Sequence, residues 1–140
     1  MATTAERPRL HVLQAIERRV LWLAVRMVDY ANRERPRGDA LKVGGHQASS
    51  ASLVTLMTAL YLSDLRGEDR VAVKPHASPV LHAIEYLMGR LDCRYLTTLR
   101  DFGGLQPYPS RTKDPFPVDY STGSVGLGSA APLFGALADR

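Results

Sequence analysis

Three short segments place histidine, glycine or serine immediately before stretches with helical periodicity. They are residues 44–50 (G-G-H-Q-A-S-S), 73–80 (V-K-P-H-A-S-P-V) and 121–128 (S-T-G-S-V-G-L-G). The first backbone N–H groups of a helix have no partner within that helix, so the start of a helix can bind an anionic ligand. These three segments are therefore the candidate ligand-binding positions of the chain.

The periodicity of the apolar residues is mostly helical. From Leu13 to Ala31 they recur every three or four residues, which predicts a helix over about residues 8–34 that Pro36 and Gly38 end. A second helix is expected over residues 50–65, with Ser49 or Ser50 as its cap. Two more helices are expected, one from Ser78 to Gly89 with Pro79 in its first turn, and one that begins near Ser124 or Gly126.

Residues 71–73 (V-A-V) form a short apolar run that is typical of a buried parallel strand. The order helix, turn, strand, turn, helix predicts an α/β fold that is mostly helical with short parallel strands. Residues 102–120 differ from the rest, because four prolines and a glycine pair exclude a long regular element. We favour an ordered loop near a site over a disordered segment there.

Composition excludes several classes of protein. With 140 residues, of which 45% are hydrophobic, the chain is one domain or part of one. The net charge is +4, but the arginine cluster at residues 32–37 contains no aromatic residue, so we expect no nucleic-acid partner. The single cysteine, Cys93, excludes an internal disulfide and a cysteine-cluster metal site, and we expect a cytoplasmic protein. No apolar run approaches the ~20 residues of a membrane span.

The histidines differ in their positions. His46 follows two glycines and precedes a helix, where a functional histidine and a hydrogen-bonded loop histidine fit equally well. His76 follows the expected strand, at the carboxyl edge where α/β folds bind ligands, which favours a functional role. We expect His82, inside the next helix, to be structural and His11 to face solvent.

The glycine motif at residues 121–128 is weak evidence when it is taken alone, since glycine-rich turns often precede helices. What makes the set specific is its order: G-H then S-S, the apolar run, H-A-S-P, a proline-rich loop with Tyr108, and T-G-S-V-G-L-G. From about Leu10 onward, this order resembles the start of the diphosphate-binding domain of thiamine-diphosphate enzymes of the transketolase superfamily. The likeness is greatest to the homodimeric pyruvate dehydrogenase first component. It implies that residues 1–140 are a single, incomplete domain of this type.

The resemblance also implies roles for individual residues. His46 and His76 match histidines that line the thiamine diphosphate and assist proton transfers, a task for which imidazole is the commonest side chain. Tyr108 matches a tyrosine near the cofactor. The backbone that contacts the aminopyrimidine ring is matched by Gly123, Ser124 and Val125.

Other features depart from the family. The family's Gly-Asp-Gly motif, which holds a magnesium ion, is absent from the sequence, so no residue is assigned to the metal. Lys74-Pro75 stands where the pyruvate dehydrogenase type has Gln-Gly, and Gly123 makes T-G-S closer to transketolase. The substrate is therefore left open between pyruvate, another 2-oxo acid and a sugar phosphate.

The resulting hypothesis is an N-terminal fragment or split piece of a thiamine-diphosphate-dependent 2-oxo acid dehydrogenase or transketolase. Such a chain is incomplete alone and needs the remainder of the enzyme or a second subunit, in an enzyme that is a dimer when complete. Two alternatives stay open: a non-catalytic remnant or interaction module with the same fold start, and a small basic nucleic-acid binder.

Overall fold

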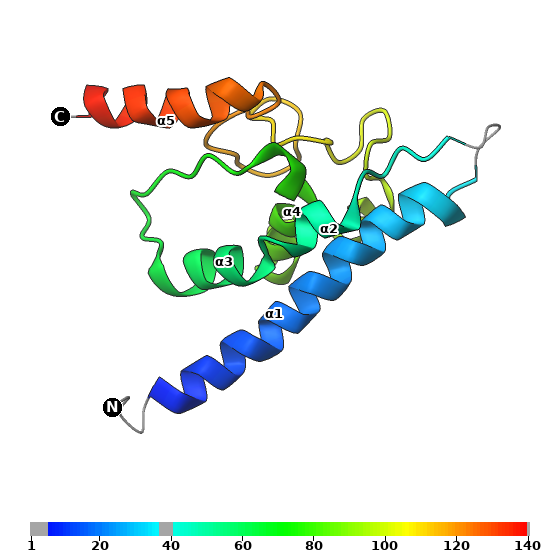
Figure 1. The fold of residues 1–140 in the computed structure, drawn as a ribbon, viewed down its shortest axis with the longest axis horizontal. Coiled ribbons are helices and arrows are strands. Elements are labelled where there is room, and N and C mark those ends of the chain that lie inside the picture. Colours follow the sequence, from blue (N-terminus) through cyan, green and yellow to red (C-terminus); the bar gives the residue numbers. More distant parts are fainter. Residues whose placement is uncertain (1–5, 37–40, 140) are drawn as a thin grey trace.

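The structure is a computed structural model that describes residues 6–36 and 41–139. Its longest element is α1 (Glu6–Asp29), which continues as a π-helical turn through Tyr30–Glu34 and crosses beneath the other helices in Figure 1. The apolar side of α1 is buried, with Val20, Ala24 and Met27 at most 2% exposed. The helix expected over about residues 8–34 is confirmed.

The second expected helix is broken in two. The structure has α2 (Gln47–Ala51), α3 (Val54–Ala59) and a further π-helical turn at Leu60–Asp64. The expected cap was wrong, because His46 occupies the cap position, whereas Ser50 is buried and its hydroxyl donates to the His76 carbonyl at 3.3 Å. The hydroxyl of Ser52 donates to the Ser49 carbonyl at 3.1 Å. Serine side chains that bond to backbone carbonyls in this way compete with regular helix geometry.

The expected strand at residues 71–73 was wrong. This segment is extended, but no strand occurs in residues 6–36 and 41–139, so the described part of the chain is mostly helical and the α/β class is not confirmed. The Val71 N–H donates to Oδ2 of Asp119 at 2.9 Å, a side-chain partner in place of a neighbouring strand. An apolar run forms a strand only when another backbone lies beside it.

The central element is α4 (Ser78–Leu87), which follows a 3-10 turn at Pro75–Ala77. All eight residues 78–85 are buried, and α4 packs against α1, α2 and α3. The expected start at Ser78 and end at Gly89 are confirmed, since Gly89 has φ of +75° after the last turn. The Ser78 hydroxyl, however, donates to the Gln106 carbonyl at 3.4 Å and does not cap the helix.

Residues 102–120 form an irregular loop that is held by its own hydrogen bonds. The carboxylate of Asp114 accepts from the backbone N–H of Gln106 at 3.2 Å and of Ser110 at 2.8 Å. Leu105 and Phe116 are buried in the common core, so the loop covers part of α4. This agrees with the expected ordered loop. A 3-10 helix at Cys93–Thr97 lies between α4 and this loop.

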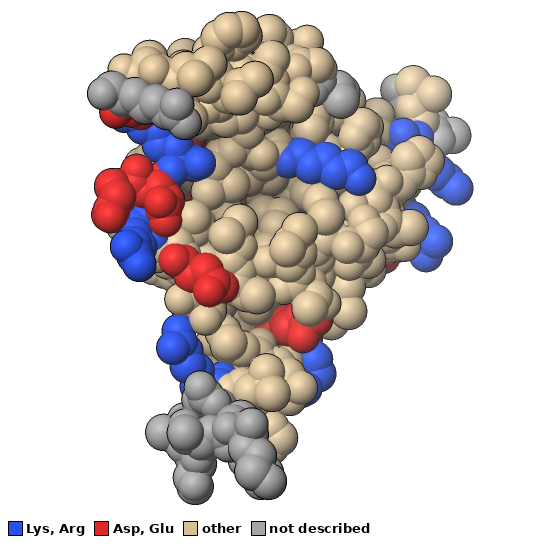
Figure 2. All heavy atoms as spheres, turned by 60° about the vertical axis from the view of Figure 1, so that its left-hand side comes forward, with Lys and Arg blue, Asp and Glu red and all other residues tan. Residues whose placement is uncertain are grey.

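The last helix, α5 (Val125–Ala138), begins after Ser124, as expected. It carries no charged residue, and the part of the molecule where it lies, at the top of Figure 2, is almost free of charged side chains. Leu133, Phe134 and Leu137 are more than half exposed. Within the described residues, no helix has the length and apolar character that crossing a membrane requires.

His82 is a buried polar residue of α4 and His11 is exposed, as expected for both. One ring nitrogen of His82, Nε2, lies 3.1 Å from the Gln106 carbonyl, which makes Nε2 the donor. The ring meets Phe116 edge-on at 5.5 Å between centroids. Burial lowers the pKa of His82 below its ordinary value of 6.5. His82 thus joins α4 to the loop as a neutral group.

We expect Met27→Ala, which removes a fully buried side chain from α1, to lower the free energy of unfolding by about 3 kcal/mol. Trp22 lies on the same helix but is 63% exposed, so Trp22→Ala should cost less than about 1 kcal/mol. Urea denaturation of the two variants measures both values. Equal losses would show that α1 is not anchored through its Met27 face.

The stability of the fold should also depend on pH through His82. The unfolded chain binds a proton near pH 6.5 while the folded state resists it, so the free energy of unfolding should fall as the pH is lowered from 7 towards 5. The variant His82→Gln, which keeps a donor for the Gln106 carbonyl, should show a shallower decline in urea titrations. His11→Gln, at an exposed position, is the control that should retain the full decline.

Candidate functional site

A cavity of about 550 Å³ lies where the end of α1, the loop before α2, the turn before α4 and the loop after Leu99 meet. Three of the residues singled out in the sequence, His46, His76 and Tyr108, line it although they are far apart in the chain. The other lining residues are Val28, Asn32, Lys42, Gly44, Gly45, Ser49, Ser50, Pro79, Leu99, Arg100 and Pro107.

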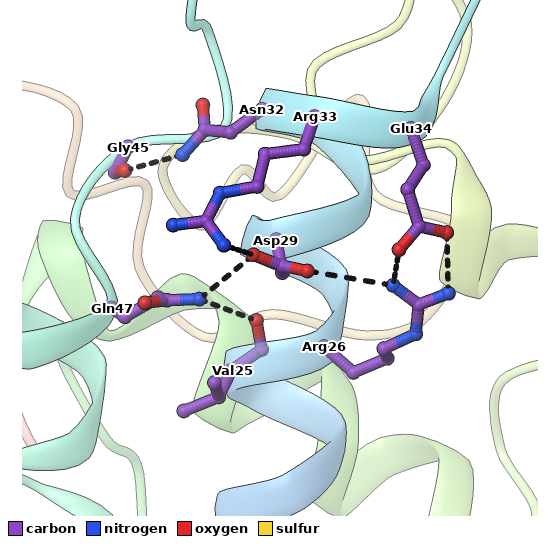
Figure 3. Close-up of polar contacts among 8 residues, drawn as sticks. All are labelled: Val25, Arg26, Asp29, Asn32, Arg33, Glu34, Gly45 and Gln47. Carbon is purple, nitrogen blue, oxygen red and sulfur yellow. Dashed lines mark hydrogen bonds and ion pairs between the residues drawn. The ribbon is translucent and has the colours of Figure 1, made fainter.

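The glycine pair before His46 lies directly against α1. Asn32 bonds to both glycines, accepting from the Gly44 N–H at 2.7 Å and donating to the Gly45 carbonyl at 3.0 Å, a contact drawn in Figure 3. A Cβ on Gly44 would lie 2.5 Å from the Val28 carbonyl oxygen, so only glycine allows this approach. Gly45 has φ of +90°, a left-handed conformation that favours glycine. The pair therefore fixes the entry of the chain into α2.

An ion-pair network lies along the end of α1, and Gln47 of α2 bonds to it (Figure 3). Asp29 pairs with Arg33 at 3.2 Å and Arg26 at 3.7 Å, and accepts a long hydrogen bond from Gln47 at 3.4 Å. Arg26 also forms a bidentate pair with Glu34 and holds the pKa of that carboxyl below its usual range. Because Gln47 directly follows His46, this network and the Asn32 contacts together determine where His46 lies.

His76 belongs to the 3-10 turn before α4, and its side chain is exposed to the cavity. Its ring meets the ring of Tyr108 edge-on, with centroids 5.7 Å apart and planes at 72°. Its backbone carbonyl accepts the hydrogen bond from Ser50. The turn is thus tied to α2, while the imidazole stays open to the cavity.

Arg100 is a cavity residue that sequence reasoning missed. Its guanidinium lies 5.9 Å from the centroid of the Tyr108 ring, within cation–π range. A Cβ on Gly45 would lie 3.1 Å from its Nη2 atom, so the side chain passes directly over that glycine. Arg100 has φ of +63°, which is uncommon for a residue other than glycine. The sequence showed only an arginine before a glycine-containing loop, which does not indicate where its side chain points.

Gly123 and Ser124 of the glycine motif are not among the described residues that line the cavity. A Cβ on Gly123 would lie 3.8 Å from the Tyr108 ring, so the motif packs against the back of that tyrosine. Ser124 and Val125 form the start of α5. Of the residues singled out in the sequence, the structure therefore brings His46, His76 and Tyr108 to the cavity, and Gly123 lies next to Tyr108.

The lining is electropositive. It contains Lys42, Arg100 and the two histidines, and none of the described residues that line the cavity is Asp or Glu. In residues 6–36 and 41–139, no group of three histidine, cysteine or carboxylate side chains could hold a metal ion. The cavity thus offers hydrogen-bond donors and positive charge, which suits an anionic ligand.

We expect Gly44→Ala to push the loop off α1, because the added methyl group would overlap the Val28 carbonyl. The free energy of unfolding should fall by about 2 kcal/mol, and amide exchange at residues 41–46 should accelerate. Gly67→Ala is the control, since nothing lies within 4 Å of a Cβ there, and its effect should stay within about 0.5 kcal/mol. A stable Gly44→Ala variant with slow exchange in the loop would contradict the close approach.

No family model matches the chain, and no solved structure matches it. Its relatives include the pyruvate dehydrogenase E1 component of Pseudomonas aeruginosa, 32% identical over 126 residues, which cover 84% of this chain. The same component of Mycobacterium tuberculosis is 32% identical over 136 residues (86% of the chain), and that of Haemophilus influenzae is 30% identical over 145 aligned positions (94%). The chain spans only 14% to 16% of the length of these relatives. It is therefore a distant relative of a small part of pyruvate dehydrogenase E1 components.

Proposed function

We propose that this chain supplies the first part of the cofactor-binding domain of a thiamine-diphosphate-dependent 2-oxo acid dehydrogenase of the pyruvate dehydrogenase E1 type. The observation that carries the proposal is the meeting of His46, His76 and Tyr108 at one cavity. The distant relationship to E1 components over 84% to 94% of the chain supports it. The remainder of the enzyme, on the same longer chain or on another polypeptide, completes the site.

The residues at the cavity fit part of the cofactor. Two imidazoles, an aromatic ring and close backbone at Gly44 and Gly45 suit the ring end of thiamine diphosphate and a small substrate. The magnesium ion that accompanies the diphosphate needs oxygen ligands such as carboxylates, which the described lining residues do not provide. In the proposed enzyme these ligands come from the remainder of the protein. When bound, thiamine diphosphate supplies the carbon centre that stabilises a substrate carbanion.

Within this proposal the side chains have distinct tasks. His46 and His76 donate hydrogen bonds to the substrate and move protons at their exposed ring nitrogens. Tyr108 orients the His76 ring through the edge contact. Asn32 and the glycine pair hold His46 in place through the backbone. A carboxylate that activates the cofactor comes from the partner subunit of the dimer, in line with the family resemblance.

A second candidate function is a non-catalytic interaction module with the same fold start. The exposed apolar side chains of α5 are the observation that favours it, because such a surface marks a site for a partner. The imidazole of His76 distinguishes the two candidate functions, because the enzyme requires it and the interaction module does not.

The test is a chimera in which this chain replaces the matching segment of the Pseudomonas aeruginosa E1 component. The chimera should decarboxylate pyruvate when thiamine diphosphate and magnesium are present, whereas the 140-residue chain alone should not. In the chimera, His76→Ala should lower kcat by roughly 10²–10⁴, the range for a lost proton-transfer group. Steady-state rates measure both effects.

His11→Ala is the matched control, because His11 is exposed on α1 far from the cavity, and this change should leave kcat unaltered. Light scattering and circular dichroism show whether each chimera is a folded dimer. A folded chimera that binds thiamine diphosphate but decarboxylates no pyruvate would contradict the enzyme proposal and favour the interaction module.

A further inference from the structure

Arg100 stands between two hollows of the surface. One is the cavity with the histidines, and the other is a shallower hollow of about 780 Å³ that Arg100 and Tyr108 share with Phe102 and Lys113. The Arg100 side chain therefore lies at the border between the enclosed cavity and the more open surface. A charged group at this position meets a small ligand as it enters.

Within the part of the chain that the structure describes, no carboxylate pairs with Arg100. The adjacent carboxylate of Asp101 is already engaged by Arg35, with Nη1 2.8 Å from Oδ1. Arg35 also donates to the Leu99 carbonyl at 2.7 Å, so the chain is anchored on either side of Arg100. The guanidinium of Arg100 keeps its N–H donors available to a ligand.

The backbone holds Arg100 in an uncommon conformation. Its φ of +63° is stabilised by a hydrogen bond from its own N–H to the Leu105 carbonyl at 2.8 Å. Strain of this kind persists where the surrounding structure enforces it, and it is concentrated at functional sites. The side chain passes over Gly45, where a Cβ would come within 3.1 Å of Nη2. Both features direct the guanidinium towards the cavity.

We propose that Arg100 binds the carboxylate of a small 2-oxo acid, with Lys42 as a second cation. This proposal rests on the proposed function and names the residue that binds the carboxylate of its substrate. A planar guanidinium bonds to a carboxylate through two parallel N–H donors. His46 and His76 line the same cavity and can reach the oxo group of an acid held at Arg100. The cofactor diphosphate is a poorer candidate, because the described lining residues offer no metal ligands beside it.

The test is a titration of the full 140-residue chain, labelled with ¹⁵N, with pyruvate, inorganic phosphate and pyrophosphate in separate series. Pyruvate should shift the Arg100 Nε–H resonance and the backbone signals of residues 44–46. Arg100→Gln should weaken pyruvate binding by roughly 10- to 100-fold, the range for a lost charged hydrogen bond. Arg100→Lys, which keeps the charge but lacks the planar fork, should weaken it less.

Arg111→Gln is the matched control, because Arg111 is exposed in the nearby loop of residues 102–120 and is not among the residues that line the cavity. This variant should bind pyruvate with the affinity of the unaltered chain. Dispersed amide spectra show whether each Arg100 variant is folded. The comparison uses Arg100→Gln if it folds and Arg100→Lys if it does not. A pyruvate affinity in that variant equal to that of the unaltered chain would overturn the assignment. Tighter binding of phosphate or pyrophosphate than of pyruvate would overturn it in favour of a phosphate site. No binding of any of the three anions would overturn it too.

The two proposals can fail separately. If the chain binds pyruvate through Arg100 while the chimera with the Pseudomonas aeruginosa E1 component is folded but inactive, the carboxylate site stands and the enzyme proposal falls. If the chimera is active and Arg100→Gln changes neither its KM for pyruvate nor its kcat, the enzyme proposal stands and the Arg100 assignment falls.

Discussion

The burial of residues 78–85 of α4 determines most of the architecture. Eight consecutive residues of this helix are buried, including His82 and Glu85, so other elements must cover it on every side. α1 covers one side, α2 and α3 cover another, and the loop of residues 102–120 closes part of the rest. Ser78 and His82 of α4 bond to the Gln106 carbonyl in the loop, and Glu85 pairs with Arg90, just after the helix, at 2.6 Å. An irregular loop with four prolines is ordered because it forms part of this core.

The candidate site follows from this arrangement, because the covers meet at the N-terminal end of α4. His46 comes from the entry to α2, His76 from the turn before α4 and Tyr108 from the loop of residues 102–120. The Ser50 hydroxyl links α2 to the His76 carbonyl, and Asn32 links α1 to the glycine pair. Packing of the core and geometry of the site are therefore linked, since a shift of α2 relative to the turn before α4 would separate the two histidines.

The sequence was sufficient to predict the elements that depend on local pattern. The stripe from Leu13 to Ala31 gave the long helix, and Ser78 with Gly89 gave the limits of α4. The strand at residues 71–73 was wrong because a strand depends on a neighbour that an apolar run cannot reveal. Arg100 could not be found, because its role depends on a backbone conformation and on the nearness of Gly45 and Tyr108 in space. His46 and His76 could be singled out because each stands at the start of a helix.

Two features on the side of the molecule opposite α1 bear on the rest of the proposed enzyme. The segment at residues 71–73 is extended and has no strand beside it in the described chain, and α5 exposes Leu133, Phe134 and Leu137. These two elements are linked, because Arg70 lies 3.8 Å from Asp139 at the end of α5. Extended backbone with no neighbouring strand can accept one, and exposed apolar side chains favour burial under further structure. Under the proposed function, the remainder of the enzyme covers these apolar side chains and also completes the cavity with the histidines.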